Sequence, residues 1–186
     1  MAGKDEKVKI PTLEENHYYI FNKEFDSAST GDAIKFIIER NFMVIERPKQ
    51  IKMIINSPGG ELPSAFALID TMKGSKIPIH TYGLGEIASC GLITFISGEK
   101  GYRFITKNTS ILSHQFAWGT FGKEHELFST IKEFNNISER LIEHYRKCTG
   151  MSESNIKKIL LPPQDVWLTA KEAVKYGLAD KIVEFY

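Results

Sequence analysis

Residues 50–74 read QIKMIINSPGGELPSAFALIDTMKG, in which an apolar run is followed by a proline and two glycines and then by a second apolar pattern. The first run, 50–56, predicts an apolar strand. The second, 61–74, has a proline in its first turn and a glycine at its end, which is typical of a helix. A strand that leads through a glycine turn into a helix is the repeating unit of α/β proteins.

The same unit recurs on both sides of this stretch. The pattern predicts strands at 17–22 and 77–83 and helices at 29–42 and 87–98, the last of them apolar on nearly all sides. Further along, it predicts two short strands, a helix opened by a capping box and a final strand, at 102–106, 110–114, 169–177 and 178–185. This alternation predicts an α/β fold with a largely parallel sheet.

One predicted helix is unusually long. Residues 122–150 contain no proline and indicate a helix of many turns, too long to lie along a domain of this size. We therefore expect a protruding helix at about 124–148. Because the chain has 186 residues, we expect a single domain over 1–186, with a polar N-terminal segment at 1–16.

The composition restricts the classes of partner. The 24 basic and 23 acidic residues leave a formal charge of +1, so no overall field favours nucleic acid or an anionic membrane. Segment 1–16 has no apolar core of a signal peptide, and no later run has membrane-spanning length. Cys90 and Cys148 lie 58 positions apart, without the spacing of a disulfide framework or a zinc site. We expect a cytoplasmic protein without a metal.

Two turns are candidate sites, because parallel sheets place their chemistry at the carboxyl ends of strands. Gly59 and Gly60 form either a simple tight turn or a pair of backbone N–H donors for a developing oxyanion. Ser89 follows the next strand and is either a helix N-cap or a nucleophile. Ile87 stands where the G-x-S-x-G motif has its first glycine, which disfavours an α/β-hydrolase.

A nucleophilic serine needs a base and a group that orients the base. Among the five histidines, His114 ends the strand predicted at 110–114, 25 positions after Ser89. The others lie in strands or on the long helix, where packing or surface roles are expected: His17, His80, His125 and His144. Asp165 lies in a proline-bounded loop and is either an ordinary loop carboxylate or the orienting group.

Several motifs occur in a fixed order over about 50–182. They are INSPGG, ALIDTM, G-x-x-A-S-x-G, HQ and D-x-x-x-x-A-x-E-A-x-x-Y-G-L-x-D. In this order they resemble the Clp peptidase family, the proteolytic subunits of ATP-dependent proteases. The resemblance implies the fold that this family shares with crotonases, built from repeated β-β-α and β-α units with a protruding handle helix.

The resemblance also implies residue roles. It makes Ser89 the nucleophile, His114 the general base and acid, and Asp165 the group that orients His114. Gly60 and Cys90 would supply the oxyanion N–H groups. The residues expected to line the substrate groove are Gly59, Gln115 and Phe116. No cofactor or metal is required.

The resemblance further implies partners. Polypeptides would be the substrates, the handle would interlock two stacked seven-membered rings of identical subunits, and an AAA+ unfoldase would feed the chamber. The sequence departs from the family where Phe116 replaces a usual proline and Gln164 replaces a frequent arginine. Lys52 and Ile54 stand where aromatic residues help to form the unfoldase-docking pocket. These departures concern the groove, the ring contacts and the docking.

Three other functions compete with a serine endopeptidase. A crotonase-like acyl-CoA enzyme would use paired N–H groups but no serine, histidine and aspartate triad. A non-catalytic ring subunit would lack a triad residue, and none is missing here. A membrane-bound serine and lysine peptidase would need a lysine base and a hydrophobic anchor.

Overall fold

The computed structural model of the chain describes residues 11–184. The predicted polar segment 1–16 and the strand predicted at 178–185 therefore lie partly outside the described residues. The strands are β1 (Tyr18–Phe21), β2 (Ile51–Ser57), β3 (Ile79–Ala88), β4 (Arg103–Ile105), β5 (Ser110–Ser113), β6 (Val166–Leu168) and β7 (Lys181–Ile182). The helices are α1 (Ser27–Phe42), α2 (Leu62–Gly74), α3 (Cys90–Phe95), α4 (Glu124–Thr149), α5 (Glu153–Asn155), the π-helix η1 (Ile156–Leu160) and α6 (Ala170–Lys175).

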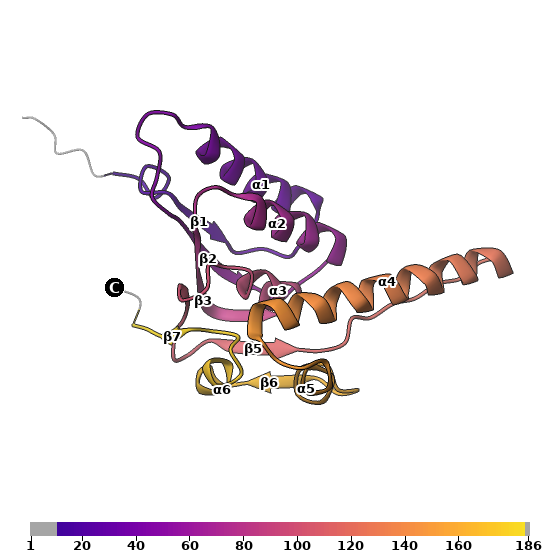
Figure 1. Cartoon of the computed structure of the whole chain (residues 1–186). Coiled ribbons are helices and arrows are strands. Elements are labelled where there is room, and N and C mark those ends of the chain that lie inside the picture. Colours follow the sequence, from indigo (N-terminus) through magenta and orange to yellow (C-terminus); the bar gives the residue numbers. More distant parts are fainter. Residues whose placement is uncertain (1–10, 185–186) are drawn as a thin grey trace, which may run out of the picture.

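The sheet is mostly parallel, as predicted. The strands β1, β2, β3, β4 and β7 lie side by side in that order, and each neighbouring pair is parallel. Figure 1 shows β1, β2 and β3 as neighbours. The strand β5 pairs with the far end of β3 in parallel, and β6 then pairs with β5 in the antiparallel direction. The α/β fold class is therefore confirmed, and the one antiparallel pair within residues 11–184 lies next to the predicted site.

The helices α1 and α2 lie over the sheet (Figure 1). The Asp26 carboxylate accepts the Ser29 N–H at 2.7 Å and caps the start of α1. On α1 the apolar residues Ala33 and Ile37 are buried, whereas Ile38 is 42% exposed. The apolar stripe of this helix is thus narrower than its sequence suggests.

The strand β3 is longer than predicted and α3 is shorter. We expected β3 to end at 83, but it continues through Gly83 and Gly85 to Ala88. Gly85 has a φ of +65°, and the next N–H, of Glu86, donates to Asn56 Oδ1 at 3.0 Å, where the pairing with β2 shifts register. This irregularity lets β3 change partner from β4 to β5. Because β3 ends at Ala88, Ser89 lies directly at the carboxyl edge of the sheet.

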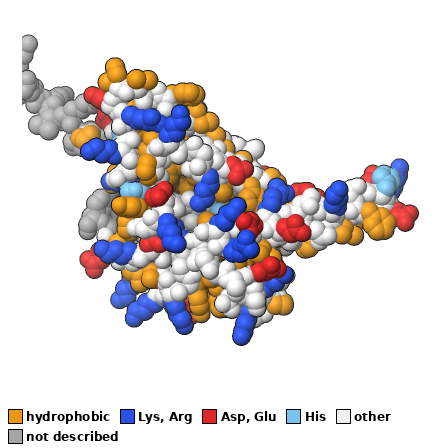
Figure 2. Space-filling model, in the orientation of Figure 1, with side chains coloured by type: hydrophobic (Ala, Val, Ile, Leu, Met, Phe, Trp, Pro, Cys, Tyr) orange, Lys and Arg blue, Asp and Glu red, His pale blue; other side chains and the backbone are white. Residues whose placement is uncertain are grey.

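The helix α4 projects from the body of the molecule (Figure 1). Its C-terminal half packs on the core through Ile137, Leu141 and Tyr145, which are buried. Its outer half and the segment before it carry large exposed apolar side chains: Phe121, Phe128, Ile131 and Phe134. Figure 2 shows hydrophobic surface along this arm.

The predicted packing roles of two histidines are seen in the structure. His80 is buried and its ring stacks on Tyr102, with the ring centroids 4.0 Å apart. His144 is buried on α4, and its Nε2 atom lies 2.8 Å from the Ile93 carbonyl. Both cysteines are buried free thiols. Within residues 11–184, no helix is long and apolar enough to span a bilayer.

Candidate active site

Ser89 occupies a strained turn between β3 and α3. Its φ of 53° and ψ of −117° lie outside the regions that non-glycine residues favour. Ser89 is the N-cap residue of α3, and its carbonyl accepts the Leu92 N–H at 3.0 Å, but its side chain makes no capping hydrogen bond. A sharp strand–turn–helix with positive φ is the geometry by which nucleophile elbows expose a serine hydroxyl. The sequence did not reveal this turn, because the glycine that marks it in α/β-hydrolases is Ile87 here.

The Gly59 turn packs directly against Ser89. Gly59 has a φ of +108°, and a Cβ atom added to it would lie 2.7 Å from Ser89 Cβ and 3.2 Å from the Cys90 nitrogen. Gly60 has a φ of +144° and is equally tight against the backbone of Phe25. Both positions therefore require glycine, and the turn brings the β2–α2 backbone beside the candidate nucleophile.

Cys90 follows Ser89 and does not compete with it as a nucleophile. Its thiol lies 3.1 Å from the Gly60 carbonyl oxygen and donates to it. Burial raises the pKa of the Cys90 thiol to about 11, so the thiol stays neutral and weakly nucleophilic near pH 7. Its backbone N–H is the first of α3, where a helix provides no acceptor of its own. The turn at Gly59 thus packs against both Ser89 and the Cys90 nitrogen.

The pairing of β5 with its two neighbours brings His114 to the same edge. The Ser89 N–H donates to the Leu112 carbonyl at 3.0 Å, two residues before His114. Ser113 pairs with Val166 across the antiparallel ladder, so the next step places His114 opposite Asp165. His114 Nδ1 lies 3.7 Å from Asp165 Oδ1. Among the described residues, no group forms a hydrogen bond with the buried Nε2 of His114.

An apolar pocket of about 370 Å³ lies beside the residues that follow His114. Gln115 Nε2 donates to the Leu161 carbonyl at 2.9 Å, and the Phe116 ring packs on Phe134 with centroids 4.9 Å apart. Gln115 and Phe116, which the resemblance implied as groove residues, line this pocket. Its opposite walls, from α4, η1 and the segment after η1, were not predicted. These additional lining residues are Phe134, Ser138, Leu141, Ile142, Lys157, Leu161 and Pro163.

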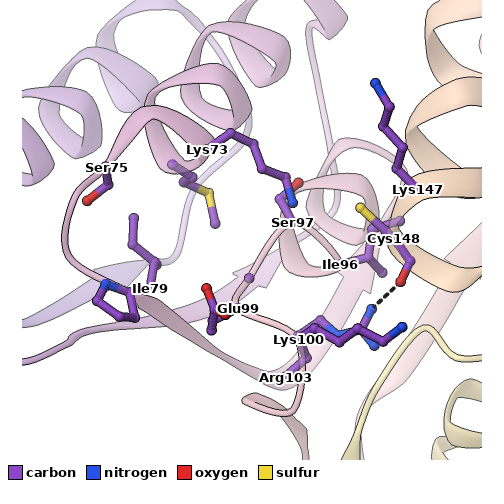
Figure 3. A pocket seen from close by; sticks show the side chains of 13 residues that line it. Lys73, Ser75, Ile79, Ile96, Ser97, Glu99, Lys100, Arg103, Lys147 and Cys148 are labelled. Carbon is purple, nitrogen blue, oxygen red and sulfur yellow. Dashed lines mark hydrogen bonds between the residues drawn. The ribbon is translucent and has the colours of Figure 1, made fainter.

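A second pocket, of about 270 Å³, contains none of the predicted site residues (Figure 3). Arg103 lies in it, but its guanidinium is already used, since it donates to the Cys148 carbonyl at 3.0 Å and to both oxygens of Asp180. Burial raises the pKa of the Cys148 thiol in its wall. This pocket therefore offers neither a free guanidinium at Arg103 nor an activated thiol at Cys148.

The chain matches a known family over most of its length. Residues 21–185, which include every predicted site residue, match the Clp protease family. The mostly parallel α/β fold agrees with the fold that the resemblance implied. The chain therefore belongs to the Clp protease family.

Proposed function

We propose that this chain is the subunit of a serine endopeptidase that cleaves unfolded polypeptides. Its family establishes a Clp-type peptidase. The serine mechanism is supported chiefly by one observation: the β5–β6 ladder brings His114 Nδ1 to 3.7 Å from Asp165 Oδ1 beside the strained Ser89 turn. A triad is recognised by such geometry and roles rather than by sequence position.

Each residue has a role in the proposed reaction. His114 takes the proton from Ser89 as the hydroxyl attacks the peptide carbonyl, and then returns that proton to the leaving amine. Asp165 stabilises the imidazolium that forms in between. The oxyanion accepts hydrogen bonds from the backbone N–H groups of Gly60 and Cys90. Water then hydrolyses the acyl-enzyme by the same steps.

The pocket beside Phe116 suits an apolar side chain of the substrate. It is lined by Gln115, the residue after His114, and by the rings of Phe116 and Phe134. Its volume of about 370 Å³ accommodates a large aliphatic or aromatic side chain. Gly59, Gln115 and Phe116 would line the groove that holds the extended peptide on either side.

The proposal includes a closed assembly formed by one domain over 1–186. The exposed apolar side chains of α4 would be covered if the handles of two stacked seven-membered rings interlock. Such an enclosed chamber admits extended chains, so folded substrates need an ATP-driven AAA+ unfoldase. Two buried free thiols fit a reducing, cytoplasmic location.

The direct test replaces the nucleophile. Ser89→Ala should lower the rate of peptide hydrolysis by at least about 10³-fold without changing the size of the assembly, because a single hydroxyl is lost. A fluorophosphonate should label wild type at Ser89, as located by peptide mass spectrometry. Ser97→Ala is the matched control, since Ser97 is a buried serine at the other end of α3. Full activity of a pure Ser89→Ala preparation would refute the mechanism.

A further inference from the structure

A buried hydrogen-bonded chain begins at the residue before His114. Ser113 is fully buried, and its hydroxyl donates to the Leu160 carbonyl at 2.6 Å. The Tyr145 hydroxyl lies 3.2 Å from Ser113 Oγ. Because a serine hydroxyl carries one proton, which is used on Leu160, Tyr145 is the donor to Ser113. The chain thus runs from α4 through the end of β5 to the end of η1.

Tyr145 is suited to act as a permanent donor. It lies at the packed base of α4 and is almost completely buried. Burial raises the pKa of its hydroxyl to about 12, so the proton stays in place at any pH at which the protein works. The hydroxyl therefore contributes a fixed hydrogen bond rather than a titrating group.

The segment that carries Asp165 is held on both sides of that residue. At one end, the Ser113 side chain binds the Leu160 carbonyl, and the Gln115 side chain binds the next carbonyl, of Leu161. At the other end, Val166 pairs with the backbone of Ser113. Ser113 and Gln115, which flank His114, thus bond to the chain before Asp165. Ser113 also pairs with Val166, directly after Asp165.

These bonds matter because the Asp165 side chain is otherwise exposed to solvent. Its side chain is 63% exposed, and its carboxylate meets His114 at 3.7 Å, longer than a hydrogen bond. The position of the loop therefore decides how closely the carboxylate approaches the imidazole. The π-helix η1 ends at Leu160, where its carbonyl is turned to the Ser113 hydroxyl.

We propose that Ser113 and Tyr145 are positioning residues for the His114–Asp165 pair, acting through the Leu160 carbonyl. The inference rests on the proposed serine mechanism, because it assigns these hydroxyls to the alignment of that pair. Loss of the Ser113 hydroxyl leaves the Leu160 carbonyl and the Tyr145 hydroxyl buried without a partner, and the segment 160–165 moves away from His114. Neither residue touches the substrate.

A neighbouring pair provides a matched control. Ser97 is buried, donates to the Ile93 carbonyl at 2.8 Å and lies 3.3 Å from Nε2 of His144, which precedes Tyr145 on α4. Like Ser113, Ser97 therefore bonds to one backbone carbonyl and to one aromatic side chain of α4. Its contacts lead to α3 and away from the Asp165 loop.

The experiment compares Ser113→Ala, Tyr145→Phe, the double variant and Ser97→Ala in the full-length assembly. With an apolar fluorogenic peptide, Ser113→Ala should lower kcat about tenfold or more and leave KM within about twofold, because alignment in the transition state is lost and the groove is kept. Tyr145→Phe should lower kcat by about threefold. The double variant should match Ser113→Ala, since the hydroxyls act in one chain. Ser97→Ala should retain wild-type kcat.

The outcomes separate this inference from the proposed mechanism. If the wild type is active and Ser113→Ala keeps its kcat, only the positioning role is overturned. An equal loss of kcat in Ser97→Ala overturns it as well. An inactive wild type overturns the serine mechanism, and hydrogen–deuterium exchange then decides the structural claim. Ser113→Ala, but not Ser97→Ala, should increase amide exchange in the segment 160–166. Unchanged exchange there overturns the inference.

Discussion

Gly59→Ala is the substitution that tests most sharply how the fold places Ser89. Gly59 carries no functional group, so an effect on catalysis must come from space and backbone conformation. Its φ is +108°, and an alanine there costs about 1–2 kcal/mol in strain. The added Cβ would lie 2.7 Å from Ser89 Cβ, whereas two carbons favour about 3.5–4.0 Å. One of the two backbones must therefore move by about 1 Å.

The effect of backbone strain at positive φ can be separated from that of the contact with Ser89 by the control variant Gly101→Ala. Gly101 has a similar φ of +92°, but an added Cβ there meets no atom within 4 Å. Both variants should lose about 2–8 °C in Tm from strain, since about 2–4 °C corresponds to 1 kcal/mol in a chain of this length. Only Gly59→Ala should also misplace the nucleophile, which lowers kcat about 100-fold.

The assay is hydrolysis of a fluorogenic peptide over a range of concentrations, with Tm measured on the same preparations. We expect Gly101→Ala to keep kcat within about twofold of wild type. A kcat for Gly59→Ala within about threefold of wild type would refute the argument that this glycine sets the position of Ser89. Equal losses of kcat in both variants would show that strain alone is responsible.

Three further outcomes are expected. Burial alone would raise the pKa of Asp180, but hydrogen bonds from Arg103 hold that pKa below its ordinary value. The ionised carboxylate therefore stabilises the fold fully above about pH 4, and this stabilisation is lost as the pH falls through the lowered pKa. The gap in Tm between wild type and Asp180→Asn should therefore close below about pH 4, and a constant gap down to about pH 2 contradicts this. Phe128→Glu combined with Ile131→Glu should separate the stacked rings while the subunit stays folded, as seen by light scattering and circular dichroism; an unchanged mass argues against contact through the handle. The isolated assembly should cleave short peptides and an unfolded protein but leave a stably folded protein intact unless an unfoldase and ATP are added, and rapid loss of the folded protein alone rules out a gated chamber.

Much of the architecture could be predicted from sequence because it depends on neighbours along the chain. The apolar runs at 50–56 and 61–74 became β2 and α2, and the capping box at Thr169 and Glu172 opens α6. These features follow from local periodicity and caps. The ordered motifs also identified the family before any geometry was known.

The sequence could not give the length of β3 or the end of α3. Gly83 and Gly85 suggest a loop, yet β3 continues through them because Asn56 and the shifted β2 register support an irregular strand. Likewise, Phe134 and Leu161 are distant in sequence from Gln115, and only the packing of α4 brings them to one pocket. Tertiary pairing overrides local preference at such positions.

The sequence by itself determined the kinds of residue available for chemistry: a serine after a strand, a histidine at a strand end and an aspartate in a loop. Only the tertiary structure decided that the β5–β6 register sets His114 opposite Asp165, and that Tyr145 bonds to Ser113, which in turn donates to the Leu160 carbonyl. The physical reason is that helix and strand periods are encoded by adjacent residues. Contacts between residues tens of positions apart depend on strand register and on the burial of polar groups that must find partners.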